Sequence, residues 1–412
     1  MNSFEHDLAE RLTALRDQNL FRELRQVDSA QSARIQIAGK AFLNFSSNDY
    51  LGLATHPALI EAAIRAVDTF GAGSGASRLI CGSLKPFHEL ETELARLKKT
   101  EAAIAFSSGY AAAQGAIGAL IGKDDIIILD KLVHACIVDA AKLSGAKIRV
   151  FRHNDVGDLE EKLQWASQNT MPRIVRRVLI VTESIFSMDG DIAPLREIVK
   201  LKDKYHAWLM VDEAHATGIF GENGGGLIGE LGLTDRVELQ MATLGKALGA
   251  SGGCICGSRR LVDFMVNRAR PFIFSTAPAP AAAAAATAAI RLVQSAEGKE
   301  LRKKLQANIS EFQSDPGINP ARSPALQYQS KSGPTASGTS RLSPIQPIIV
   351  GDEQRALDAA AKLRERQLFV PAIRYPSVAR GSARLRITFT AAHSREDIFC
   401  LVDALKSLDI RD

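Results

Sequence analysis

The sequence has no apolar run approaching the roughly 20 residues that a membrane-spanning helix needs. The alanine-rich stretch 281–290 is too short and too weakly apolar to qualify. Residues 1–12 contain neither the basic start nor the apolar core of a secretory signal, so we expect no such signal. The absence of both features predicts a protein of the cytoplasm with no membrane partner.

Cysteines are few, and their number is odd. The five thiols lie mostly in apolar segments, which favours reduced cysteines over a disulfide framework. Neither an H-E-x-x-H helix nor a P-loop occurs. Cys254 and Cys256 share one apolar strand pattern without further ligands nearby, so we interpret them as core residues and predict no metal site.

A strong charge of one sign is also missing. The 51 Lys and Arg residues against 46 Asp and Glu residues leave a net charge of +5, and the basic residues are dispersed. Binding to phosphate backbones normally needs a concentrated basic face, so we predict no nucleic-acid partner. With 46% hydrophobic residues, the chain has ample apolar surface for a folded core.

Short apolar runs alternate with helical patterns along most of the chain. Continuous apolar strands separated by helices are typical of a mainly parallel sheet that is covered on both faces. The clearest strands are 34–37, 125–130, 147–151, 178–182, 208–211 and 253–256, with helices at 134–143, 156–166 and 194–205. A further set of strands at 346–350 and 383–388 alternates with helices at 353–367 and 394–405.

The predicted fold class is α/β. We expect an N-terminal helix and strand segment (1–45), a large domain (46–282) and a smaller α+β domain (283–412). Leu8, Leu12 and Leu15 give the first helix an apolar stripe, and the Ser- and Gly-rich stretch 330–342 is expected to be a loop.

One glycine motif resembles a dinucleotide-binding fingerprint. Gly71, Gly73 and Ala76 have the G-x-G-x-x-A spacing, but residues 59–70 before them have a helical pattern. The fingerprint requires a preceding strand, so we do not interpret the motif as a nicotinamide site.

A different set of residues is more informative. Asp212 and His215 follow the apolar run 208–211, and Lys246 follows another short apolar run within a Gly-rich setting. An aspartate can keep a pyridine ring protonated, and a semi-buried lysine loses its proton easily enough to bond a carbonyl cofactor. Each residue alone is compatible with a strand cap, a loop or the surface. With Ser107–Tyr110, a candidate phosphate cradle at a helix start, they favour pyridoxal 5'-phosphate.

Eight motifs then resemble the α-oxoamine synthases, which are fold-type I pyridoxal-phosphate transferases, in the order that this family has them. They are NFSSNDYLGL (44–53), GSGASR (73–78), SSGY (107–110), RHND (152–155), TESIFSMDGD (182–191), DEAHATG (212–218), TLGK (243–246) and ARLRITFTAAH (383–393). Ala216 and Ser377 stand where the family commonly has Gly and Thr. Neither departure removes a catalytic group.

The resemblance implies a seven-stranded sheet and a role for each matching residue. Lys246 would bond the cofactor and later act as the base, while Asp212 would pair with the pyridine nitrogen. His134 would lie over the ring, and His215 and Ser187 would contact the ring's phenolic oxygen. Gly109, Tyr110 and Thr243 would bind the phosphate, together with Ser275 and Thr276 of a neighbouring subunit in a homodimer. The implied substrate-binding residues are Arg22, Asn48, His134, Arg374 (for the amino-acid carboxylate) and Ser377.

Within the family, the motifs are most similar to the member that condenses L-alanine with a pimeloyl thioester, on coenzyme A or acyl carrier protein, in biotin biosynthesis. Glycine C-acetyltransferase, 5-aminolevulinate synthase and synthases of long-chain or signal molecules, which differ in the acyl pocket, are the alternatives. A non-catalytic partner subunit would be expected to lack Lys246. A transcription regulator with an aminotransferase-like domain would need a helix-turn-helix module before the motifs.

Overall fold

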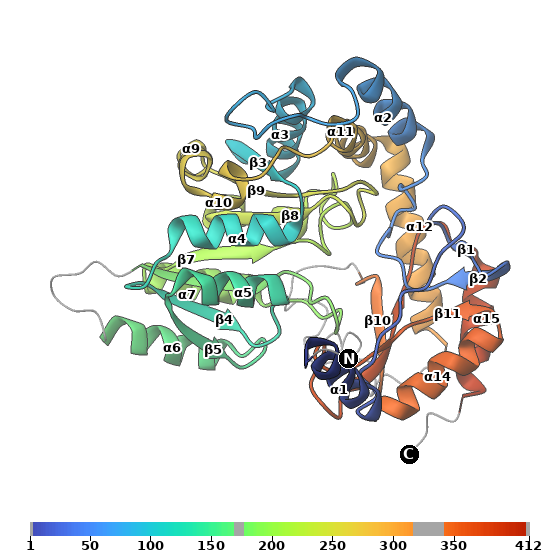
Figure 1. Cartoon of the computed structure of the whole chain (residues 1–412). Coiled ribbons are helices and arrows are strands. Elements are labelled where there is room, and N and C mark those ends of the chain that lie inside the picture. Colours follow the sequence, from blue (N-terminus) through green and yellow to red (C-terminus); the bar gives the residue numbers. More distant parts are fainter. Residues whose placement is uncertain (1–2, 169–176, 316–341, 409–412) are drawn as a thin grey trace.

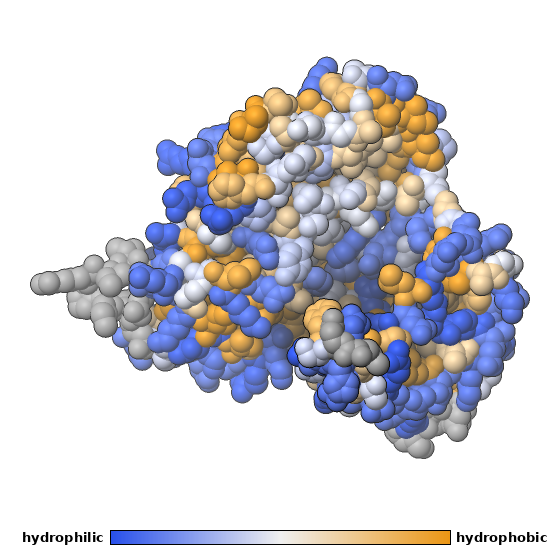
Figure 2. All heavy atoms as spheres, viewed as in Figure 1, coloured by the Kyte–Doolittle hydropathy of each residue, from blue (hydrophilic) through white to orange (hydrophobic). Residues whose placement is uncertain are grey.

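The computed structural model describes residues 3–168, 177–315 and 342–408, and within them no helix is long and apolar enough to cross a bilayer. The predicted loop 330–342 lies, except for its last residue, outside these ranges. A larger body built on a seven-stranded sheet stands beside a smaller body that holds both ends of the chain (Figure 1). The surface is hollowed between the two bodies (Figure 2).

The large sheet has the order β3-β9-β8-β7-β6-β4-β5, and β9 is its antiparallel member. Successive side chains of β4 enter opposite cores: Ile126 and Ile128 join one cluster, and Ile127 and Leu129 the other. This two-sided burial explains why the strands are continuously apolar. The strands are β3 (Ala102–Phe106), β4 (Ile126–Asp130), β5 (Lys147–Phe151), β6 (Val178–Glu183), β7 (Trp208–Asp212), β8 (Leu239–Thr243) and β9 (Gly253–Gly257).

Helices cover both faces of this sheet. One face packs against α4 (Gly109–Leu120), α5 (Ala135–Ser144), α9 (Arg259–Arg268) and α10 (Arg270–Ile273). The other face packs against α3 (Lys85–Lys98), α6 (Val156–Gln168), α7 (Leu195–Lys204), α8 (Leu227–Glu230) and α11 (Pro280–Gln294), with α2 (Pro57–Phe70) outside α11. A 3₁₀ turn, Thr234–Arg236, precedes β8.

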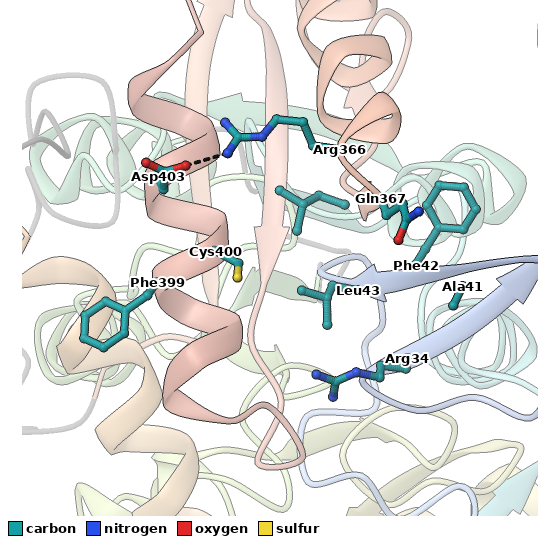
Figure 3. A pocket seen from close by; sticks show the side chains of 10 residues that line it. Arg34, Ala41, Phe42, Leu43, Arg366, Gln367, Phe399, Cys400 and Asp403 are labelled. Atoms are coloured by element: carbon teal, nitrogen blue, oxygen red, sulfur yellow. Dashed lines mark hydrogen bonds and ion pairs between the residues drawn. The ribbon is translucent and has the colours of Figure 1, made fainter.

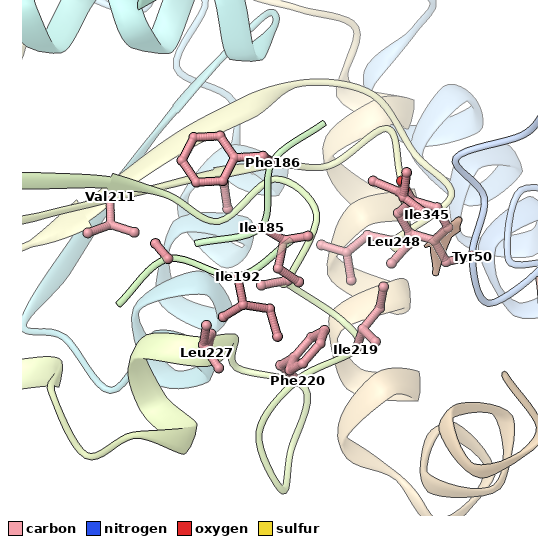
Figure 4. Packing of buried hydrophobic residues seen from close by; sticks show 14 of the residues in the cluster. Tyr50, Ile185, Phe186, Ile192, Val211, Ile219, Phe220, Leu227, Leu248 and Ile345 are labelled. Atoms are coloured by element: carbon pink, nitrogen blue, oxygen red, sulfur yellow. The ribbon is translucent and has the colours of Figure 1, made fainter. Parts of the chain in front are cut away.

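The hydrophobic cluster that contains Ile126 and Ile128 extends into the loops beyond the sheet. In Figure 4, Ile192 from the loop after β6 lies beside Phe220 and Leu227, and Ile185 and Phe186 of the same loop belong to the same buried cluster. The backbone of this loop is closed by a bridge between Ile185 and Ile192. It is therefore a packed part of the structure.

The smaller body contains two three-stranded sheets. One has the order β10-β13-β12 and the other β1-β2-β11, so the N-terminal strands pair with a C-terminal one. Its elements are β1 (Arg34–Ile37), β2 (Lys40–Asn44), α12 (Ala296–Gln313), β10 (Ile345–Gly351), α14 (Glu353–Glu365), β11 (Leu368–Phe369), β12 (Ala372–Ile373), β13 (Ala383–Thr388) and α15 (Arg395–Lys406). The domain limits at 45 and 282 stay predictions.

The fold class and the seven-stranded, mainly parallel sheet are confirmed. The short strands β2, β11 and β12 were not predicted, and two further details differ from the sequence prediction. Strand β3 was not among the predicted strands, because its sequence AAIAF carries little β-branched character. The apolar stripe of α1 (Ser3–Asp17) covers no core, since the helix has no buried residue in the single chain.

Candidate active site

Four parallel strands end at the same edge of the large sheet, and each is followed by predicted site residues. His134 follows β4, Ser187 follows β6, His215 follows β7 and Lys246 follows β8. This edge faces the smaller body, because Arg386 of β13 donates from Nε to the Ser187 carbonyl at 2.7 Å. Open parallel sheets form their sites where strands end and loops begin.

Lys246 follows β8, which lies between β7 and the antiparallel β9. Its Nζ is 2.8 Å from His215 Nε2, and the lysine is half-buried. Burial lowers the pKa of Lys246, although the nearby carboxylate of Asp212 opposes this shift. A lysine in these surroundings loses its proton more readily than one at the surface, and this favours its use as a nucleophile and a base.

A chain of hydrogen bonds leads from Lys246 to Arg386. Tyr50 Oη lies 2.7 Å from His215 Nδ1 and donates to Asn48 Oδ1 at 3.0 Å, and Asn48 Oδ1 also accepts from Arg386 at 3.2 Å. Tyr50 has one proton to give, so His215 must donate from Nδ1 to Tyr50, which leaves Nε2 to accept from Lys246. Burial lowers the pKa of His215, and the Lys246 charge lowers it further, as the neutral tautomer requires.

Two carboxylates lie side by side at the ends of β6 and β7. Glu183 and Asp212 are register partners, and both side chains are buried. Burial raises the pKa of Glu183 and that of Asp212, while the Lys246 charge opposes both shifts. Asp212 Oδ1 accepts from the Ala214 backbone at 2.8 Å. Asp212 and Lys246 therefore act on one another electrostatically, and the structure records no direct ion pair between these two described residues.

His134 begins helix α5. The side-chain Nδ1 of His134 accepts from the Cys136 backbone at 3.2 Å, and the backbone N–H of His134 donates to Glu183 Oε1 at 2.6 Å. Burial lowers the pKa of His134, with opposite contributions from Asp212 and Lys246. The imidazole is thus held by its helix cap within electrostatic range of both groups.

The start of helix α4 forms a tight cradle. The first N–H groups of a helix have no intrahelical acceptor, and Ser108 satisfies only the third, from Ala111, at 3.1 Å. A Cβ at Gly109 would lie 2.6 Å from Thr243 Cγ2, so no larger residue fits there. Thr243 Oγ1 is buried with no hydrogen-bond partner among the described residues. Free N–H groups and an unpaired hydroxyl at a helix start fit the phosphate of pyridoxal phosphate.

The two predicted acyl-site residues, Arg22 and Ser377, meet Arg374, the predicted carboxylate-binding residue, at a different point. Arg22 donates to the Tyr375 carbonyl at 3.0 Å, and Arg374 donates to the carbonyls of Asn19 and Phe21. The Ser377 backbone donates to the Arg374 carbonyl at 3.0 Å. The structure therefore brings Arg22, Arg374 and Ser377 together, with Arg374 occupied by the N-terminal segment.

Two predicted phosphate ligands lie apart from Lys246 in the same chain. Ser275 and Thr276 are exposed, and Thr276 forms a backbone bridge with Ser77. Tyr110 is also exposed, and its hydroxyl donates to Asp139 Oδ2 at 2.8 Å.

The sequence prediction missed three residues of this site: Tyr50, Glu183 and Arg386. All three lie within motifs that the sequence displays, but spacing alone gave them no role. Arg386 is buried in the sheet of the smaller body and acts electrostatically on Lys246 and His215. Arg386 is therefore a second candidate, beside Arg374, for holding a substrate carboxylate.

An open pocket of about 500 Å³ lies elsewhere, between β2 and α15 (Figure 3). An ion pair between Arg366 and Asp403 crosses it, and none of the predicted site residues lines it.

The fold and the site together define a fold-type I pyridoxal-phosphate enzyme. The chain belongs to the aminotransferase class I and II family, whose model matches residues 40–405.

Within this family, the chain is similar to particular enzymes. The chain is 44% identical to 8-amino-7-oxononanoate synthase of Anaeromyxobacter dehalogenans over 402 residues, covering 96% of this chain and 94% of the relative. It is 45% identical to the enzyme of that name from Geotalea daltonii, covering 96% of both chains. Among solved structures, serine palmitoyltransferase of S. paucimobilis, determined with bound PLP–myriocin, matches with a TM-score of 0.84 and 29% identity, covering 97% and 96%. The 8-amino-7-oxononanoate synthase of Francisella tularensis matches with a TM-score of 0.69 and 27% identity, covering 89% and 97%.

Proposed function

We propose that this chain condenses L-alanine with a pimeloyl thioester to give 8-amino-7-oxononanoate, CO₂ and the free thiol, a step of biotin biosynthesis. The observation that carries the reaction type is the cluster of Lys246, His215 and Asp212 at the sheet edge. Identities of 44–45% over nearly the whole chain support the substrate assignment.

Bound pyridoxal phosphate supplies an electron sink for the negative charge that develops at the amino-acid Cα. Asp212 would hold the pyridine nitrogen, and His134 would support the ring from one side. The cradle of Gly109, Tyr110 and Thr243 would bind the phosphate through backbone N–H groups and the hydroxyl. His215 and Ser187 would contact the phenolic oxygen.

The chain's own proton chemistry centres on Lys246. Its pKa is lowered by burial, so its neutral amine can take the proton from Cα and later return one to the same carbon. His215, kept neutral with Nε2 toward Lys246, holds the amine in position. The carbon–carbon bond forms between Cα and the thioester carbonyl, the thiol leaves, and CO₂ then leaves the new β-keto acid.

The substrate carboxylate needs a cation near Lys246. Arg386, which donates to Asn48 and to the Ser187 carbonyl, would provide it through a charge-assisted, two-point interaction. Arg22, Arg374 and Ser377 lie together at the N-terminal segment and are proposed to bind the acyl substrate. This assignment moves to Arg386 the carboxylate role that the family resemblance implied for Arg374.

The experiment is a product analysis by mass spectrometry. The protein is incubated with alanine, glycine or serine and with pimeloyl, succinyl, acetyl or palmitoyl thioesters. We expect the alanine–pimeloyl product to form fastest by at least about tenfold, which corresponds to about 1.4 kcal/mol in the barrier. Preference for glycine or serine would refute the substrate assignment, and failure to form any amino ketone would refute the reaction.

We further propose a homodimer that shares its active sites. Ser275 and Thr276 are exposed next to Phe274, which is 69% exposed, and their segment is bridged to the one that carries Ile80, which is 79% exposed. Figure 2 shows hydrophobic side chains over the top of the molecule, near α2 and α3. Burying such a patch against a second copy would bring Ser275 and Thr276 to the partner's phosphate.

Light scattering of the double variant Ile80→Glu, Phe274→Glu tests this. We expect a monomer with weakened pyridoxal-phosphate affinity; a variant that stays dimeric, or a monomer that binds the cofactor normally, would contradict the proposal.

We also propose that the protein is located in the cytoplasm. All five cysteines are free thiols, and a reducing compartment favours this state.

A further inference from the structure

The RHND motif (152–155) has no role in the chemistry described so far, although it lies in the loop after β5. Its histidine lies between two carboxylates, one at the end of β4 and one in the loop after β6. His153 Nδ1 is 2.9 Å from Asp130 Oδ1, and His153 Nε2 is 2.6 Å from Asp191 Oδ2. The side chains of Asp130 and Asp191 are buried, and that of His153 is 23% exposed.

This geometry requires a charged imidazolium. A neutral imidazole has one N–H, so one of its nitrogens would present a lone pair to a carboxylate; the imidazolium donates from both. Burial lowers the pKa of His153, but hydrogen bonds to Asp130 and Asp191 and their charges outweigh burial and raise it to about 10. The ring also packs edge-on against Phe186, with centroids 4.4 Å apart.

The two carboxylates hold the loops that carry site residues. Asp130 ends β4, and its Oδ1 accepts from the Leu132 backbone at 2.8 Å, two residues before His134. Asp191 closes the loop after β6, since its carbonyl accepts from the Phe186 backbone at 3.0 Å, beside Ser187. A single cation thus connects the loop of His134 with the loop of Ser187.

The remaining motif residues support the same connection. Asn154 donates from its backbone to Asp130 Oδ2 at 2.9 Å and from Nδ2 to Asp191 Oδ2 at 2.8 Å. It does so in the left-handed region, at φ 55°, which asparagine tolerates better than most residues. Asp155 accepts from the Asp158 backbone at 2.9 Å and so begins helix α6.

We propose that His153 is a positioning residue for the reaction: as an imidazolium bridging Asp130 and Asp191, it fixes the spacing between the loops that carry His134 and Ser187, two of the proposed cofactor-binding residues. Only the predicted effects on kcat rest on the proposed function. The bridge itself is a property of the chain and can be measured without turnover. His153 is not among the residues proposed to contact the substrate or the cofactor, so its effect would pass through the two loops.

The first test is nitrogen NMR of the cofactor-free protein with labelled histidine, which has eight such residues. The His153 signals are assigned by their loss in His153→Gln. We expect both ring nitrogens to carry protons at pH 8, where an ordinary histidine is neutral. A neutral ring at that pH would overturn the proposal, whether or not the protein forms 8-amino-7-oxononanoate.

The second test compares His153→Gln with Arg152→Gln. Arg152 is the matched control, because it lies in the same motif, is exposed and forms its side-chain hydrogen bond with Asp155 among the described residues. We expect His153→Gln to lower kcat about 10- to 100-fold, since small misplacements of reacting groups cost this much. In His153→Gln the circular dichroism of bound pyridoxal phosphate should also weaken at saturating cofactor. In Arg152→Gln both kcat and this dichroism should stay at the wild-type value.

A third variant separates positioning from general loss of stability. Asp191→Asn removes the same bridge, so adding it to His153→Gln should lower kcat less than the product of the two single effects. Equal kcat and dichroism in His153→Gln and Arg152→Gln would refute the proposal. So would fully multiplicative effects of His153→Gln and Asp191→Asn.

Discussion

A buried ion pair beneath the active site gives the most quantitative prediction. Lys98 Nζ donates to Glu213 Oε2 at 2.8 Å and to Thr217 Oγ1 at 2.6 Å, and both charged side chains are fully buried. Glu213 directly follows Asp212 and also accepts from the Ile228 backbone at 2.9 Å. Lys98→Met keeps the side-chain volume but leaves the Glu213 charge buried without its partner.

Removing one partner of such a pair costs about 3–5 kcal/mol. For a chain of 412 residues this corresponds to a fall in Tm of about 3–6 °C. The assay is thermal unfolding of cofactor-free protein at one fixed concentration. Adding Glu213→Gln, which removes the stranded charge and keeps an acceptor for the Ile228 backbone, should recover at least half of the loss.

The control is Lys85→Met at the other end of α3. Lys85 pairs with Glu89 at 3.5 Å, and both side chains are exposed, so its Tm should not change. If Lys98→Met unfolds at the wild-type temperature, or if the double variant is less stable than the single one, the reasoning is wrong.

Three further predictions concern the cofactor, the substrate and pH. Thr243→Val should weaken pyridoxal-phosphate binding about 10- to 100-fold in an absorbance titration, because a hydrogen bond to a charged group contributes about 1.5–3 kcal/mol. Arg386→Lys should raise the KM for alanine at least about tenfold, whereas Arg374→Lys should mainly raise the KM for the thioester; the reverse would restore the sequence-based assignment. Burial lowers the pKa of His393 to about 4, so its contribution to stability is complete above about pH 6.5 and is lost as pH falls toward 4. The free energy of unfolding should fall by about 3 kcal/mol between pH 6.5 and about 4, and by less in His393→Gln. Thermal unfolding of both proteins across this pH range measures the difference.

Much of this fold could be predicted because its signals are local. The strand 383–388 and the first strand, 34–37, are found where the sequence patterns predict them. Asp212, His215 and Lys246 could be grouped before any coordinates, because parallel strands bring their carboxyl ends to one edge. The family, the fold class and the cofactor are confirmed by the comparisons.

Long-range contacts could not be predicted in this way. Tyr50 meets His215 across 165 residues, and Arg386 meets Asn48 across 338, and no periodicity encodes such pairs. The pairing of β2 with β11 likewise joins the N-terminal segment to the smaller body. The roles of the individual site residues stay predictions until variants are measured.

The central claim is that Lys246 moves the Cα proton of alanine during a decarboxylative condensation. Its most direct test is the mass of the product formed from a pimeloyl thioester and L-alanine that carries deuterium at Cα and a heavy carbon in its carboxyl group. We predict 8-amino-7-oxononanoate that has lost the heavy carbon completely and most of the deuterium, which exchanges with solvent protons on Lys246. A product that retains the carboxyl carbon or all of the deuterium would contradict the account.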